Sequence, residues 1–449
     1  MGASSLASGP ALTALTAVAR YAIRGPAVGF RGDPFLVPAD EALWYEPDAV
    51  VAIRGERIAD IGPAADVLAR LPPATPVVRY PRALLMPGFI DCHVHYPQLG
   101  IAGAVGYPLL DWLERYTFPA EAAFADAGHA GRVAAVFLDQ LRRNGTTTAA
   151  VYGTVHPQSV DALFTAALPT GLRVFAGKAL MDRNAPAGLL DTARRGYDES
   201  KDLIARWHGR GGRLHHALTL RFVATSTAEQ LEATAALWRE HPGMLLQSHL
   251  AENTAELGWV RELFPEARDY TDVFDRFGLL GPGAVFGHGI HLSASERERL
   301  AASGAAIAHC PTSNLALGSG LFDVAATRSA GVMVGLATDV GAGTTLSMLA
   351  TMGAAMLVAR LRGASLHPAQ ALWLATAGAA RTLGLGAVTG NLAPGLDADL
   401  VVIDPASTPL LAERMTTVTG IDDVLTALMT LGDDRNVVAT YAGGRRVFG

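Results

Sequence analysis

The chain has 449 residues, half of them apolar and 17% charged, so it can bury a large core. Its 36 basic and 42 acidic residues give a formal charge of −6, which argues against nucleic acid or an anionic membrane as a partner. Two cysteines exclude a disulfide framework, and no run of about 18 apolar residues indicates a membrane span. We therefore expect a soluble, cytoplasmic protein.

The chain before residue 84 predicts a loose end followed by a small sheet. Residues 1–20 are rich in Ala, Ser and Thr but have no basic segment before an apolar stretch, so we expect no signal peptide. Residues 21–83 contain short β-like runs at 50–53 and 57–61, broken by Gly and Pro. Such runs are typical of a small antiparallel sheet with tight turns.

From residue 84 the chain alternates between short apolar runs and helix-like stretches. The strand candidates are residues 84–95, 146–153, 173–181, 214–222, 244–252, 284–291, 305–310 and 332–340. Two intervening helices are expected to begin at capping boxes, Thr227 with Gln230 and Ser293 with Glu296. Eight alternating units predict an α/β fold with a (β/α)8 TIM-like barrel over residues 84–388.

The last part of the chain resembles the first in having short predicted strands between Gly-containing turns. Residues 345–362 and 368–385 are predicted as helices, and residues 399–403 and 437–441 as strands between Gly-containing turns. We therefore predict that residues 389–449 join residues 21–83 in a small β-sandwich domain beside the barrel.

Ligand-type side chains lie at the ends of four of the eight predicted barrel strands. Two histidines one residue apart point to the same side of a strand, because side chains alternate with period two. The residues concerned are His93 and His95 on the first strand, His249 and Glu252 on the fifth, His288 and His291 on the sixth, and Asp339 on the eighth.

Each of these residues has an ordinary structural explanation when taken alone. His249 could be a core histidine, Asp339 a helix N-cap, and His288 competes with His291, which would face the opposite way. Together they lie where barrel active sites lie, and their donor set suits a borderline ion such as zinc. The fourth strand has no lysine to bridge two ions, so we predict one ion, and we expect His215 and His216 to be structural.

Sequence motifs then narrow the family. Pro87-Gly88-Phe89-Ile90-Asp91-x-His93-x-His95, Ser248-His249-x-x-Glu252, His288-Gly289 and Thr338-Asp339 resemble the amidohydrolase superfamily, in the branch that deaminates heterocycles. Residues 108–121, 144–148, 221–222 and 307–314 resemble the guanine deaminases within that branch. The resemblance covers about residues 86–342 in the expected order.

The resemblance implies a function for each matching residue. It implies one Zn²⁺ per subunit bound by His93, His95, His249 and Asp339, with His288 binding the metal or holding its water. It implies Glu252 as the proton shuttle, Gln98 and Arg221 as purine contacts, and Phe222 packed against the ring. Trp112 and Tyr116 are left open between core and pocket wall. It also suggests a homodimer.

The expected reaction is hydrolytic deamination of guanine to xanthine and ammonia. Glu252 would deliver a proton to a ring nitrogen, Asp339 would accept the water proton, and the forked donors of Arg221 would select a carbonyl such as O6 over the amine of adenine. Two alternatives stay open. One is a related deaminase of 8-oxoguanine, a pterin or a triazine; the other is a catalytically silent scaffold, which the complete ligand set disfavours.

Overall fold

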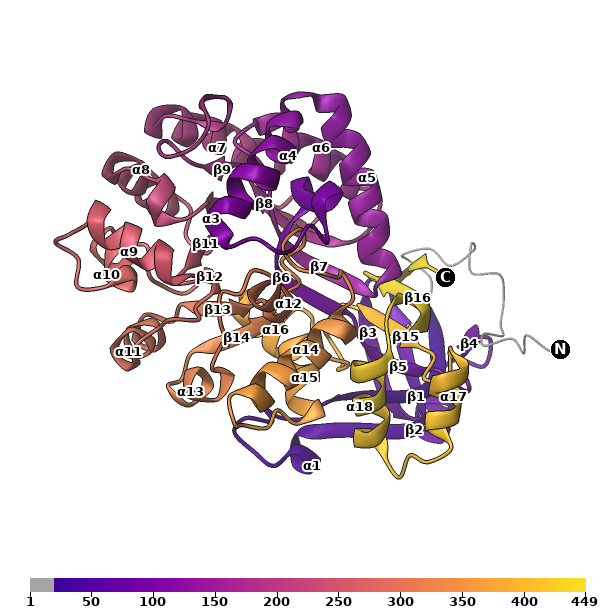
Figure 1. The fold of residues 1–449 in the computed structure, drawn as a ribbon. Coiled ribbons are helices and arrows are strands. Elements are labelled where there is room, and N and C mark those ends of the chain that lie inside the picture. Colours follow the sequence, from indigo (N-terminus) through magenta and orange to yellow (C-terminus); the bar gives the residue numbers. More distant parts are fainter. Residues whose placement is uncertain (1–19) are drawn as a thin grey trace.

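The computed structural model describes residues 20–449. The predicted loose N-terminus, residues 1–20, lies outside the described residues except for Arg20, which begins the first strand. Figure 1 shows a barrel of strands and helices beside a second sheet in which indigo and yellow strands from the two ends of the chain lie side by side.

The barrel is built from parallel strands, and all eight predicted strands are present in it. They are β6 (Phe89–His95), β7 (Thr146–Tyr152), β8 (Arg173–Gly177), β10 (Leu214–Leu220), β11 (Leu245–Leu250), β12 (Ala284–His288), β13 (Ala306–His309) and β14 (Met333–Leu336). Their order is β14-β13-β12-β11-β10-β8-β7-β6, and the short β9 (Ala179–Leu180) pairs with β10. The edges nearly close, because the amides of His95 and Asp339 donate to the carbonyls of Val340 (2.7 Å) and His93 (2.9 Å).

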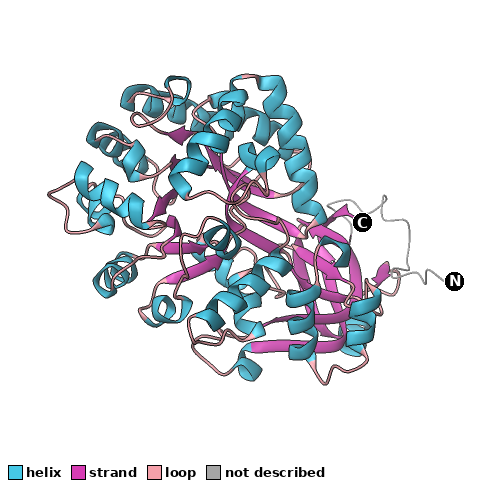
Figure 2. Cartoon of the chain, in the orientation of Figure 1, coloured by secondary structure: helices cyan, strands magenta, loops and turns pink. Residues whose placement is uncertain are grey.

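Helices surround the barrel strands, as Figure 2 shows in cyan. They are α3 (Leu109–Trp112), α4 (Phe118–Ala122), α5 (Ala127–Arg143), α6 (Pro157–Ala167), α7 (Ala193–Trp207), α8 (Ala228–Glu240), α9 (Thr254–Leu263), α10 (Tyr270–Arg276), α11 (Ala294–Ser303), α12 (Pro311–Ala316), α13 (Val324–Ser329), α14 (Met348–Leu361), α15 (Pro368–Leu374) and α16 (Ala377–Thr382).

The two predicted capping boxes behave differently. Ser293 and Glu296 bond reciprocally at the start of α11, as predicted. At α8 the side chain of Thr227 accepts from the amide of Gln230, but the Gln230 side chain turns into the core instead of returning to the cap. The second prediction is therefore only half right, since the bond from the amide of Gln230 to Thr227 is present and the return bond from the Gln230 side chain is absent.

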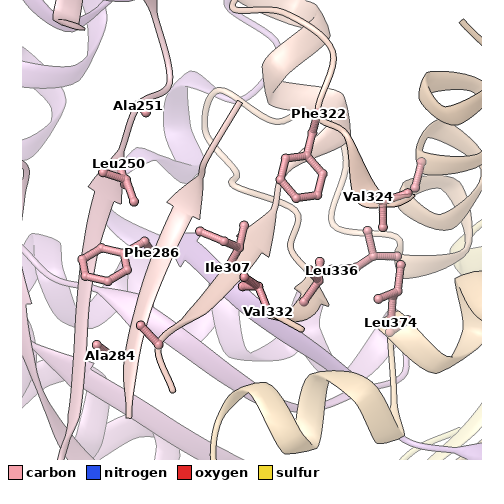
Figure 3. Close-up of a cluster of buried hydrophobic side chains, with 14 of the residues drawn as sticks. Leu250, Ala251, Ala284, Phe286, Ile307, Phe322, Val324, Val332, Leu336 and Leu374 are labelled. Carbon is pink, nitrogen blue, oxygen red and sulfur yellow. The ribbon is translucent and has the colours of Figure 1, made fainter. Parts of the chain in front are cut away.

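The core lies between the barrel strands and their helices. Figure 3 shows Phe286, Ile307 and Leu336, from three neighbouring strands, packed with Phe322 and Leu374 from outside the barrel. The barrel strands are buried along almost their whole length, and several are largely apolar, because both faces of a parallel barrel strand are covered. No helix among residues 20–449 is long and apolar enough to cross a membrane.

The second sheet takes strands from both ends of the chain, as predicted. Its order is β17-β16-β15-β5-β1-β2-β3, with β4 paired to β1. Its strands are β1 (Arg20–Phe30), β2 (Leu43–Arg54), β3 (Arg57–Pro63), β4 (Val77–Arg79), β5 (Leu84–Pro87), β15 (Leu400–Ile403), β16 (Val437–Ala442) and β17 (Arg445–Phe448). The remaining helices are α1 (Ala39–Ala42), α2 (Ala64–Arg70), α17 (Pro409–Met415) and α18 (Ile421–Leu431).

Three predicted elements prove to be divided, of which residues 173–181 form β8 and the separate β9. Residues 84–95 form two strands, because β5 pairs antiparallel with β15 in the terminal sheet while β6 enters the barrel. Gly88 joins them at a point where a Cβ would lie 2.4 Å from Oγ1 of Thr147. Residues 368–385 form α15 and α16, separated at Thr376, whose backbone (φ −139°, ψ −98°) is not helical.

Candidate metal centre and active site

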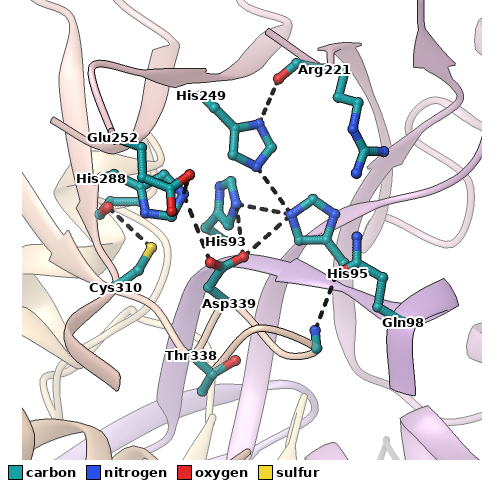
Figure 4. Close-up of polar contacts among 12 residues, drawn as sticks. His93, His95, Gln98, Arg221, His249, Glu252, His288, Cys310, Thr338 and Asp339 are labelled. Atoms are coloured by element: carbon teal, nitrogen blue, oxygen red, sulfur yellow. Dashed lines mark hydrogen bonds and ion pairs between the residues drawn. The ribbon is translucent and has the colours of Figure 1, made fainter. Parts of the chain in front are cut away.

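The ends of four barrel strands bring the predicted ligand side chains together (Figure 4). Nε2 of His95 lies 3.1 Å from Nε2 of His93 and 3.2 Å from Nε2 of His249. Oδ1 of Asp339 lies 3.2 Å from Nε2 of His93 and 3.3 Å from Nε2 of His95. Imidazole nitrogens facing one another this closely with a carboxylate oxygen are the donor set of a borderline metal ion.

His288 belongs to the same cluster. One donor atom each from His93, His249, His288 and Asp339 lie within 4.8 Å of one another. Nε2 of His288 is buried without a hydrogen-bond partner and lies 3.8 Å from Oδ2 of Asp339. His291, the alternative on this strand, instead donates from Nε2 to the carbonyl of Ser319 (2.9 Å). The residues therefore fit a metal ion, with His288 as the member from β12.

Neighbouring groups fix the orientation of two of these rings. Nδ1 of His249 donates to the backbone carbonyl of Arg221 (2.5 Å), and Nδ1 of His288 donates to Oδ1 of Asn314 (2.9 Å). Each bond leaves the lone pair of Nε2 directed into the cluster, which is how partners behind metal-bound histidines usually act. Asn314 had no role in the sequence interpretation beyond its place in a family-like segment.

A buried carboxylate ties β6 to the end of β14. Asp91 accepts from the amide of Thr338 (3.0 Å), from its hydroxyl, and from the amide of His93 (3.3 Å). Burial raises the pKa of Asp91 to about 7, against these hydrogen bonds. The contacts hold His93 and Asp339 at a fixed separation across the barrel closure.

Burial and charge set the protonation states of the cluster. Burial lowers the pKa of His93 to about 4 and holds that of His249 well below its ordinary value. Burial would raise the pKa of Asp339, but hydrogen bonds from His93 and His95 outweigh it and hold that pKa well below the usual range. Two neutral imidazoles beside an ionised carboxylate are the states that metal binding needs.

Glu252 is poised differently. Burial raises its pKa to about 7, against the attraction of His288, whose Nε2 lies 3.4 Å from Oε2. Burial lowers the pKa of His288, but the carboxylates of Glu252 and Asp339 outweigh this and raise it. The hydroxyl of Ser319 donates to the other oxygen of Glu252 (3.1 Å). Glu252 can therefore gain and lose a proton near neutral pH.

A pocket opens beside the cluster. All three predicted substrate contacts, Gln98, Arg221 and Phe222, line it. Trp112 also lines the pocket, whereas Tyr116 packs against Tyr107. Figure 4 shows Glu252 and Arg221 on opposite sides of the imidazoles, so a small ring bound between them would meet an acid on one side and a cation on the other.

The sequence interpretation missed Glu121. This buried residue of α4 accepts from Nη1 of Arg221 on both oxygens (2.8 and 2.6 Å) and from Nε2 of Gln98 (2.9 Å). It lies in the family-like segment 108–121, but a glutamate on a short helix is ordinarily exposed to solvent, so the sequence carried no signal for its burial.

Comparison with known proteins identifies relatives of the chain. The profile of the Amidohydrolase family matches residues 84–447. Guanine deaminase from Escherichia coli (strain K12) is 46% identical over 407 residues, which cover 91% of this chain and 92% of that protein. The solved structure of E. coli guanine deaminase has a TM-score of 0.92 at 44% identity, covering 95% of this chain and 99% of its own. Guanine deaminase from C. acetobutylicum, solved with guanine in its active site, has a TM-score of 0.87 at 27% identity, covering 96% of this chain and 100% of its own.

Proposed function

The chain belongs to the amidohydrolase family, and from that premise we propose that it hydrolyses guanine to xanthine and ammonia in the barrel pocket. The observation that carries the proposal is the pairing of a buried imidazole–carboxylate cluster with Glu252 on one side and Arg221 on the other. The C. acetobutylicum relative, named for the same reaction, binds guanine in its own active site.

We propose zinc as the metal, one ion per subunit, held by His93, His95, His249 and Asp339, with His288 binding the ion or its water. The four imidazoles and one carboxylate support this choice, because nitrogen-rich sets with one carboxylate suit zinc. A bound zinc ion would supply hydroxide near neutral pH by lowering the pKa of its water to about 7.

The protein's own groups move the protons. Glu252 holds a proton near pH 7 and is proposed to deliver it to a ring nitrogen when C2 is attacked. Asp339 is proposed to accept the proton of the attacking water and pass it to the departing ammonia.

The residues opposite Glu252 in the pocket are proposed to recognise the purine. Arg221 would donate to O6, Gln98 would bond the same edge, and Phe222 would pack against the ring. Adenine carries an amine at that position and would leave a buried donor facing a donor, which sites of this kind reject strongly.

We also propose a cytoplasmic homodimer whose barrel, residues 84–388, stands beside a β domain of residues 21–83 and 389–449. Two free buried cysteines support a reducing compartment. Residues 84–87 pair within the terminal sheet, so the two parts share that strand.

Ammonia release from purified, zinc-loaded protein tests the function. Guanine should be deaminated and adenine should not. Ammonia from 8-oxoguanine, a pterin or a triazine in place of guanine would overturn the specificity, and no ammonia from any of these heterocycles would favour a scaffold.

A further inference from the structure

Glu121 connects two residues that reach the pocket from different parts of the chain. Gln98 follows β6, Arg221 follows β10, and the Glu121 carboxylate accepts from both side chains. All three side chains are buried, and Glu121 is fully so. The deaminase chemistry proposed above gives Glu121 no part.

The local backbone explains how Glu121 reaches this position. α3, a π-helical turn (Leu113–Thr117) and α4 follow one another without a break, and Leu109, Trp112 and Leu113 from the start of this segment line the pocket. A π turn shifts the register of the residues after it and is often found at functional sites. The ring of Phe118, in this segment, lies 5.6 Å from the guanidinium of Arg221. The carboxylate of Glu121 contacts the same guanidinium.

The carboxylate determines what Arg221 and Gln98 offer a ligand. Both of its bonds to Arg221 use Nη1, so the other donors of that fork are left for the pocket. A carboxylate only accepts, so the nitrogen of the Gln98 amide must face it, while Oε1 turns toward the amide of Gly341 (3.4 Å). The negative charge of Glu121 also offsets the positive charge of Arg221.

We propose that Glu121 is a positioning residue that sets ligand specificity. It fixes the geometry of Gln98 and Arg221, and its charge keeps this group of side chains neutral overall. Neutral guanine is then bound, while xanthine, a stronger acid that loses a ring proton more readily, is not retained as its anion. This inference rests on the proposed deamination of guanine.

Glu121→Gln separates the charge from the shape of this side chain. The variant should raise KM for guanine about tenfold with a much smaller change in kcat, because the chemical groups around the metal are untouched. Xanthine, whose affinity is measured by calorimetry on either side of its ionisation, should bind several-fold more tightly than to the wild type once it is anionic. Opposite shifts for the two ligands cannot arise from general loosening.

Two further variants keep the test decisive. Glu121→Asp retains the charge, so xanthine affinity should stay at the wild-type level while KM rises. Asp33→Asn is the control, because it breaks another buried ion pair, between Arg328 and Asp33 (2.7 Å), away from the pocket. It should lower the free energy of unfolding and leave both KM for guanine and the affinity for xanthine unchanged. The proposal would be overturned if Glu121→Gln left guanine KM and xanthine affinity unchanged, or if it weakened or strengthened the binding of both ligands together. Failure of the wild type to deaminate guanine would instead overturn the function.

Discussion

At the scale of single residues, the metal centre is a place of concentrated strain. Ala251, His288 and Asp339 have φ values of 49°, 70° and 50°, in the left-handed region that residues with a Cβ avoid. Such conformations cost about 1–3 kcal/mol each and persist only where the surroundings enforce them. All three lie at or just after the ends of β11, β12 and β14. The left-handed backbone there directs these side chains, or those of the adjacent residues, toward the cluster.

Glu252→Gln should retain the metal and lose about 10²–10⁴-fold in kcat. The amide keeps the shape of the side chain but cannot carry the proton, and Glu252 is not among the four clustered donor groups. Xanthine formation and zinc content should be measured on the same preparation. Glu229→Gln, an exposed carboxylate on α8, is the control, and near-normal turnover in Glu252→Gln would remove its proposed role.

Arg221→Ala should raise KM for guanine at least tenfold and narrow the preference for guanine over adenine, because the donors to O6 are lost. Zinc should stay bound, since the carbonyl that orients His249 belongs to the backbone of residue 221. Kinetics with both purines and metal analysis check this. An unchanged preference for guanine over adenine would contradict the assignment of Arg221 to O6.

The clustered histidines and Asp339 could be predicted because strand ends and a period of two place them without knowledge of the packing. Glu121 and Asn314 could not, because each acts only through a neighbour brought close by the fold. Their residue types are common, and their spacing from the site carries no periodic signal.

At the scale of elements, the buried barrel strands were predictable because continuous apolar runs mark strands covered on both faces. β1 was missed because Gly25 and Pro26 interrupt its sequence like a turn. The strand in fact continues through a register shift between Gly25 and Ala27, where a proline needs no ladder hydrogen bond. The joint between β5 and β6 was missed because neither side of Gly88 is polar.

Gly88→Ala tests that joint. Its Cβ would meet a buried, β-branched Thr147 at 2.4 Å, so the free energy of unfolding should fall by about 1–3 kcal/mol. Gly131→Ala, within α5 and with no atom within 4 Å of its added Cβ, should instead stabilise by about 0.5–1 kcal/mol. Urea denaturation of both variants measures this, and equal effects would show that no close approach exists at Gly88.

At the scale of the whole molecule, buried charges hold the terminal sheet to the barrel. Arg213 bonds Asp397 (2.9 Å) and Asp399 (2.6 Å), and Arg173 bonds Asp397 (2.6 Å). The arginines stand near the starts of β8 and β10, while the aspartates precede β15. The meeting of the two chain ends was predictable from their texture, but this ion network was not, since it joins residues about two hundred positions apart.

His216 should make the whole fold sensitive to acid. It is buried, both ring nitrogens lack partners, and burial lowers its pKa to about 3. Between about pH 6.5 and 3 the unfolded chain binds a proton here that the folded chain does not, so stability falls as pH falls, by about 1.4 kcal/mol per unit. His216→Leu should flatten this dependence. Urea midpoints at several pH values decide it, and identical slopes in both proteins would contradict it.

One zinc ion in the buried cluster is proposed to make this pocket a guanine deaminase site. The most direct test measures zinc content and xanthine formation together, after the metal has been removed by a chelator and while zinc is added back. Activity should disappear with the metal and return in proportion to zinc, with full recovery at one ion per chain. Full activity in metal-free protein, or a requirement for two ions per chain, would contradict the account.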